Sequence, residues 1–120
     1  MPMLEGEEAL KHLSFAHNDI PKIENIVSLP ELESLDISQN KLQDISKMPT
    51  FQNLKVLNLS KNFIDTIEKM ECLPSLEVLD LNDNRILKIE NLSSLQKLKV
   101  LNLSNNLITI LDIPHPMKSL

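Results

Sequence analysis

The sequence predicts an α/β solenoid, a fold in which successive repeats each add one strand to a single parallel β-sheet. Three observations predict it: one asparagine recurs every 22 residues, a fixed pattern of leucines precedes it, and apolar residues follow it at intervals of three. A unit of this length buries its apolar face only by stacking on its neighbours. The 120 residues therefore form one domain of five repeats, which begin at Leu10, Leu32, Leu54, Leu76 and Leu98.

The first half of each repeat predicts a short strand. Aligned on the asparagine, the five repeats read LKHLSFAHNDI, LESLDISQNKL, LKVLNLSKNFI, LEVLDLNDNRI and LKVLNLSNNLI. Because side chains alternate along a strand, the apolar residues point to the core and the residue between them points away from it. Parallel stacking of five such strands gives a concave sheet about 20 Å long, at roughly 4.8 Å per strand.

The second half of each repeat predicts a compact return limb. Apolar residues stand three apart, as at Ile64, Ile67, Met70 and Leu73, and Pro114 is the one failure of the pattern. A period of three suits a 3₁₀ turn or one short helical turn, and about ten residues leave room for no more.

The recurring asparagines predict a structural ladder at the bend between strand and return limb. A buried amide there satisfies backbone groups of its own bend and of the adjacent repeat. The ladder consists of Asn18, Asn40, Asn62, Asn84 and Asn106.

The two ends predict the domain boundaries. Residues 1–9 form an N-terminal segment that is an incomplete cap, and residues 10–120 form the repeat domain. We expect no distinct C-terminal cap, because Leu120 falls in register as the first leucine of a sixth repeat. The inward residues of the last repeat should then face solvent, namely Leu98, Leu101, Leu103, Ile108 and Leu111. The chain is accordingly expected to be a short isoform or fragment of a longer protein, or to associate through this end.

Composition excludes several classes of function. A single cysteine excludes a disulfide framework and favours a reducing compartment, and nothing at the start of the chain reads as a secretory signal. A net charge of −5 without a basic block argues against nucleic acid, and no apolar run is long enough to span a membrane. The single glycine excludes the glycine-rich phosphate-binding loops and the nucleophile elbow.

No catalytic, metal or cofactor site is expected. His12, His17 and His115 lie too far apart along a solenoid to converge on a metal ion. Cys72 occupies a small-residue position of the return limb, and no base is assigned to it. The sequence therefore predicts a protein that is not an enzyme.

These repeats resemble the leucine-rich repeat superfamily. The 22-residue length and segments such as Lys22-Ile23-Glu24-Asn25-Ile26 and Lys88-Ile89-Glu90-Asn91-Leu92 are similar to one intracellular subfamily. That subfamily includes the leucine-rich repeat regulatory subunit of protein phosphatase one and the leucine-rich repeat light chain of axonemal dynein. The resemblance implies a non-enzymatic protein that binds a partner protein across its concave face.

The concave face is the expected binding surface of this architecture. Its candidate partner-binding residues are polar or charged and point away from the core; they are Asp36, Asn58, Lys61, Asp80, Asp83, Asn102 and Asn105. Phe63 and Arg85 are candidate anchors, because the repeat pattern places them in solvent and the chain has no Trp, no Tyr and a single Arg. The acidic members favour a partner with a basic or polar contact surface.

Two functions remain open from the sequence. The first is an intracellular scaffold or adaptor similar to a phosphatase regulator, in the cytoplasm, with the nucleus or cilium as other compartments. The alternative is a ciliary, axonemal or other assembly module that associates with itself or another repeat protein through its C-terminal edge.

Overall fold

The computed structural model describes residues 10–21, 23 and 29–111, with the side chains of Ile110 and Leu111 excepted. The predicted N-terminal segment 1–9 and the last residues of the chain, which include Pro114, His115 and Leu120, lie outside the described residues. The expected absence of a C-terminal cap therefore falls outside them as well.

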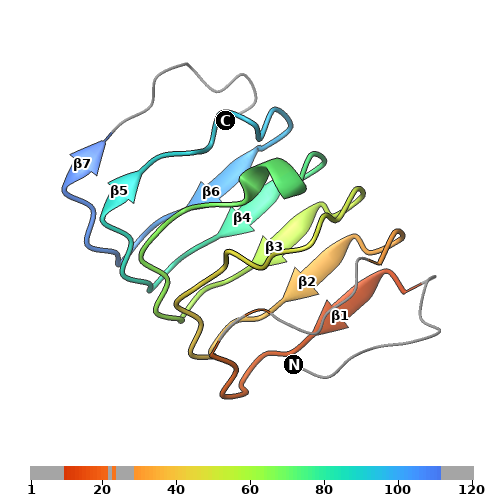
Figure 1. Ribbon diagram of the computed structural model, residues 1–120, viewed down its shortest axis with the longest axis horizontal. Coiled ribbons are helices and arrows are strands. Elements are labelled where there is room, and N and C mark those ends of the chain that lie inside the picture. The colour runs from red at the N-terminus through yellow and green to blue at the C-terminus, as the bar shows by residue number, and fades with distance from the viewer. Residues whose placement is uncertain (1–9, 22, 24–28, 112–120) are drawn as a thin grey trace.

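Five short strands form one parallel sheet (Figure 1). They are β1 (His12–Ser14), β2 (Ser34–Asp36), β3 (Val56–Asn58), β4 (Val78–Asp80) and β6 (Val100–Asn102), in the spatial order β1-β2-β3-β4-β6. Each residue pairs with the residue 22 positions later, as Leu35 pairs with Leu57 and Leu57 with Leu79. The predicted parallel solenoid is confirmed.

The sheet ladder continues beyond the residues that define each strand. In the third turn of the solenoid, the N–H groups of Leu59 and Lys61 donate to the carbonyls of Asp80 and Asn82, both at 2.8 Å. Phe63 then donates to the carbonyl of Leu42, in the turn before, at 2.7 Å. Backbone hydrogen bonds thus keep neighbouring turns in the same register through the bend and into the return limb.

The return limbs contain less helix and more strand than the sequence predicts. Among the described residues, the one helical element is the 3₁₀ helix η1 (Met70–Cys72). Single turns form where the N–H groups of Leu32 and Leu98 donate to the carbonyls of Leu29 and Leu95. Two return limbs instead form a second parallel sheet from β5 (Lys88–Ile89) and β7 (Ile110–Leu111). Figure 1 shows these two strands on the opposite limb from the five-stranded sheet.

The core lies between the five-stranded sheet and the return limbs. Nearly all of it is leucine and isoleucine, with Phe51 as its largest side chain, and Cys72 is a buried member. At the C-terminal side the prediction is partly wrong: Leu98 is fully buried, because it packs into the main apolar cluster rather than facing solvent. Leu101, Leu103 and Ile108 are half-buried.

The asparagine ladder joins neighbouring turns through buried amides. Asn62 Oδ1 accepts from Leu42 N–H at 3.0 Å, and its Nδ2 lies 3.0–3.1 Å from the carbonyls of Ile37, Leu59 and Ser60. Asn40 and Asn84 repeat this arrangement and are likewise buried. Asn106 does so in a half-buried position.

Asn18 is the member of the ladder that differs. Its side chain is exposed, and its amide donates within its own bend, to the carbonyls of Phe15 and Ala16. It therefore provides a control for the buried positions.

We predict that Asn62→Ala lowers the free energy of unfolding by about 2–4 kcal/mol, measured by urea denaturation. The substitution leaves the buried N–H of Leu42 without a partner, which costs about 1–3 kcal/mol when water does not reach it. It also removes one of the two hydrogen bonds accepted by each of three carbonyls, those of Ile37, Leu59 and Ser60, at about 0.5–1.5 kcal/mol for each bond. Asn18→Ala is expected to cost about 1 kcal/mol or less, because water replaces the bonds that it removes. Equal losses in the two variants would show that the ladder does not link the turns.

Candidate functional site

The predicted concave face corresponds to the side of the five-stranded sheet turned away from the core, here called the open sheet face. Each strand presents two residues on it. The first column contains Val56 and Val100, which are 38% and 52% exposed, with half-buried Val78 between them. The second column is polar and consists of Ser14, Asp36, Asn58, Asp80 and Asn102. The polar column therefore crosses all five strands, whereas the first column is apolar on β3, β4 and β6 and carries His12 and Ser34 on β1 and β2.

The polar column has a structural role that the sequence analysis missed. Asp36 Oδ1 accepts from the backbone N–H of Ser38 at 2.9 Å, and Asp80 Oδ1 accepts from Asn82 N–H at 2.9 Å. Asn58 and Asn102 do the same two residues ahead, at 3.0 Å. Such turns use a short side chain with an acceptor oxygen, as in Asp, Asn, Ser or Thr, and the column contains the first three of these types. In each aspartate one oxygen serves the backbone, and the second carboxylate oxygen makes no protein hydrogen bond among the described residues.

The residues before the ladder asparagines share a left-handed backbone. His17, Gln39, Lys61, Asp83 and Asn105 have φ between 54° and 62°, although none is glycine. This conformation turns the chain from the strand into the bend, and it is tolerated best by Asn, Asp and His among these types. Lys61, Asp83 and Asn105 therefore occupy fixed positions at the end of the open sheet face.

A polar network orders the C-terminal part of this surface. Asn82 Oδ1 lies 2.6 Å from Ser104 Oγ and 3.3 Å from Asn105 Nδ2, and Asn82 Nδ2 donates to Asp83 Oδ2 at 3.1 Å. Asn82 thus connects Asp83 with Asn105, two of the predicted binding residues. The sequence signal was present, because Asn82 stands where the other repeats have Ala or Ser.

The candidate anchors Phe63 and Arg85 lie in a different place from the other predicted residues. They follow the ladder asparagines directly, in a set of equivalent positions that we call the lateral row: Asp19, Lys41, Phe63, Arg85 and Leu107. The guanidinium carbon of Arg85 lies 4.4 Å from the centre of the Phe63 ring, and Lys41 Nζ lies 3.7 Å from Asp19 Oδ1. The structure therefore brings the two anchors together, outside the strands of the open sheet face.

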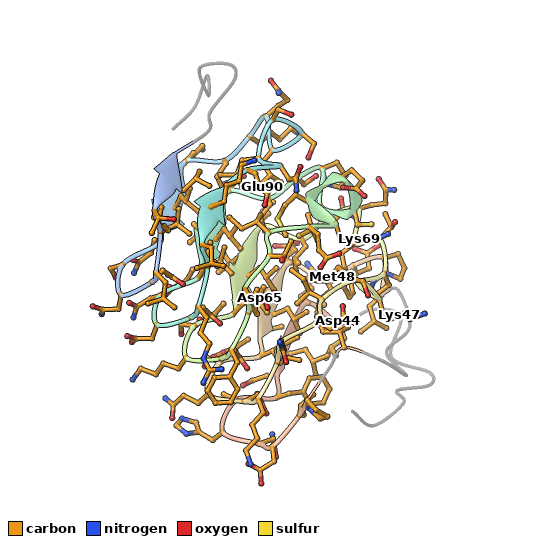
Figure 2. All side chains as sticks on the ribbon, turned by 60° about the vertical axis from the view of Figure 1, so that its left-hand side comes forward. Asp44, Lys47, Met48, Asp65, Lys69 and Glu90 are labelled. Atoms are coloured by element: carbon orange, nitrogen blue, oxygen red, sulfur yellow. The ribbon has the colours of Figure 1, made fainter. Side chains whose placement is uncertain are left out.

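Other candidate chemistry is sparse in the described part of the chain. No group of three His, Cys, Asp or Glu side chains there is placed to hold a metal ion, and no helix there is long and apolar enough to cross a membrane. A shallow pocket on the return limbs is lined by Glu68, Lys69, Glu71, Asn91, Ser93 and Ser94. Figure 2 shows Lys69 beside η1, on the return limbs rather than on the five-stranded sheet.

We predict that Lys61→Asn raises the free energy of unfolding by up to about 1 kcal/mol, because a left-handed backbone is less costly for Asn than for Lys. The control is Lys47→Asn, at an exposed return-limb position (Figure 2) without positive φ. It should bring no gain in thermal or urea denaturation. Stabilisation of both variants to the same extent would contradict the conformational explanation.

Comparison with protein families identifies the repeat. A leucine rich repeat model matches residues 30–86, a model of two leucine rich repeat copies matches residues 8–50, and a single-repeat model matches residues 97–120. Together they cover most of the sequence, including all five strands of the main sheet.

Individual relatives match shorter or more distant stretches. Human leucine-rich repeat-containing protein 49 is 44% identical over 51 residues, which are 42% of this chain and 7% of that protein. In a crystal structure of the Drosophila melanogaster SNF/U2A′ complex, a chain matches 90% of this one at 26% identity and TM-score 0.71, and 72% of that chain is covered. A chain of the TLR13–ssRNA13 complex matches 88% at 27% identity and TM-score 0.73, with 19% of that chain covered.

Proposed function

Because this chain belongs to the leucine-rich repeat proteins, we propose that it is a non-catalytic scaffold or adaptor that binds another protein on its open sheet face. The partner presents a basic or polar contact surface, and neither a cofactor nor a nucleic acid takes part. Family membership supports the class of function. The charge and geometry of the face support the kind of partner.

The observation that carries this proposal is that the two carboxylate oxygens of each aspartate in the polar column have different roles. One oxygen of Asp36 and of Asp80 fixes the side chain against its own backbone, and the other is free of protein partners among the described residues. A carboxylate held in this way loses little conformational entropy when it accepts a hydrogen bond from a Lys or Arg. The adjacent valines supply exposed apolar area beside these charges.

Partner chemistry distinguishes this proposal from nucleic-acid binding. One structural neighbour comes from a complex with single-stranded RNA, and another from a complex of SNF with U2A′. The present chain carries a net charge of −5, and Asp36, Asp80 and Asp83 lie on or next to the open sheet face. This charge repels phosphate groups and attracts a basic protein surface.

A narrower form of the proposal assigns the chain to phosphatase regulation. In that form the partner is the catalytic subunit of a phosphatase. In a ciliary form, the partner is a component of an axonemal assembly, and the C-terminal edge of the repeat stack joins the two. Both forms place the protein inside the cell, in agreement with a single, buried free cysteine, Cys72. Both also depend on capture of a partner protein.

We predict that Asp80→Asn together with Asp83→Asn weakens binding of a captured partner by about tenfold or more. Asparagine already occupies the equivalent positions at Asn58 and Asn105, so the variant keeps the backbone hydrogen bond of Asp80 and the left-handed turn of Asp83. Partners are selected from a displayed library of protein fragments on the immobilised chain, and affinities are then measured with purified proteins.

The matched control is Glu68→Gln together with Glu71→Gln, which changes the net charge by the same amount on the return limbs. It should leave the affinity within about twofold, because screening limits the effect of charges more than about 10 Å away. Equal loss in both double variants, or no loss in the aspartate variant, would overturn the assignment of the partner site to the open sheet face.

A further inference from the structure

The lateral row carries one positive charge that the described part of the molecule does not neutralise. Arg85 is the single arginine of the chain, and its guanidinium stacks on Phe63. Among the described residues the guanidinium of Arg85 takes part in no ion pair or hydrogen bond, whereas the ammonium of Lys41 in the same row pairs with Asp19. Stacking fixes one face of the guanidinium and leaves the N–H groups at its edge available to a ligand.

Two acidic side chains that stand beside the lateral row are engaged elsewhere: Asp65, two residues after Phe63, and Asp83, two residues before Arg85. Asp65, labelled in Figure 2, accepts from Gln43 Nε2 at 3.4 Å and from Thr66 Oγ at 3.1 Å. Asp83 accepts from Asn82 Nδ2 at 3.1 Å. The hydrogen bonds of these two carboxylates therefore direct them to neighbours other than Arg85.

Exposed apolar side chains stand around Arg85. Phe63 precedes it and Leu107 follows it in the lateral row, while Leu87 lies two residues further along the same extended segment. These side chains are 39%, 56% and 51% exposed. The turns that carry them are held in register by the bonds from Arg85 N–H to Ile64 O at 2.8 Å and from Leu107 N–H to Ile86 O at 3.0 Å. An ion pair formed among apolar groups is less screened by water.

We propose that the lateral row from Phe63 to Leu107 binds an amphipathic helix of a partner protein that carries one carboxylate between two apolar residues. The carboxylate accepts from the edge of the Arg85 guanidinium, and the apolar residues pack on Phe63 and on Leu107 with Leu87. This surface and its acidic ligand are distinct from the open sheet face and its basic ligand.

Spacing favours a helix over an extended segment. Neighbouring turns of a parallel solenoid lie about 4.8 Å apart, so Phe63, Arg85 and Leu107 span about 10 Å. Helical residues at i, i+4 and i+7 share one face, lie about 5–6 Å apart and span about 10.5 Å. Alternate residues of an extended strand are about 6.7 Å apart and span about 13 Å, which exceeds the spacing of the row.

The test uses two synthetic helical peptides of about 20 residues, a length that forms stable helices when alanine-rich. One presents the face Leu-x-x-x-Glu-x-x-Leu, and the other has Lys in place of Glu. We expect the Glu peptide to bind the full chain roughly tenfold more tightly in a fluorescence anisotropy titration, because a charge-assisted pair replaces a repulsive one. Amide chemical shifts should change at Phe63, Arg85 and Leu107 rather than along β2 to β4.

Arg85→Gln should reduce the difference between the two peptides to about twofold or less, because it removes the charge and keeps a polar side chain. Lys41→Gln is the matched control: it removes one positive charge from the same row and should preserve the difference. Equal binding of both peptides, survival of the difference in Arg85→Gln, or shifts confined to the open sheet face would overturn the proposal. Capture of basic partners that depends on Asp80 and Asp83 would be unaffected, so the two proposals fail separately.

Discussion

The buried asparagine amide is the interaction on which the rest of the structure depends. At the bends of Asn40, Asn62 and Asn84 the chain leaves a strand, and its carbonyl and N–H groups turn into a buried position that water does not reach. One amide satisfies four of them, and it does so across two turns, as Asn62 bonds Ile37 in one turn and Leu59 in its own. Without the amide of Asn62, the N–H of Leu42 would be unpaired, at a cost of about 1–3 kcal/mol, and three carbonyls would each lose one of two hydrogen bonds. The amide therefore ties each buried bend to the turn before it and favours one register between them.

A fixed register makes every equivalent position a row across the solenoid. The apolar rows form the core, and the rows between them form surfaces whose composition is decided one repeat at a time. Along the open sheet face the backbone favours short side chains with an acceptor oxygen in the polar column, since this oxygen accepts from the N–H two residues ahead. Charge is a property that this backbone bond leaves free to vary, and Asp at positions 36 and 80 makes the column acidic there, which is why the proposed partner site includes these two residues.

The sequence predicted what periodicity controls. The strands, their parallel order and the asparagine ladder all repeat every 22 residues, so the same sequence pattern indicates them five times. What it did not predict depends on contacts between particular side chains or on local backbone geometry. The left-handed residues include Lys61 as well as Asn105, and no shared residue type marks them. The pairing of β5 with β7 and the burial of Leu98 likewise follow from packing between turns.

Phe63 and Arg85 show where single-sequence reasoning reaches its limit. Their positions in solvent followed from the repeat, and their mutual stacking agrees with their adjacent places in one row. Their separation from the strands of the open sheet face did not follow, because the column pattern alone does not tell which side of the bend a side chain occupies. In a repeat fold, residues that match the repeat pattern are explained by their contribution to the stability of the stacked turns. Residues that depart from it have to be judged one by one: Asn82 bonds Ser104 and Asn105 of the next turn, whereas the guanidinium of Arg85 makes no such bond among the described residues and is therefore the stronger candidate for a binding role.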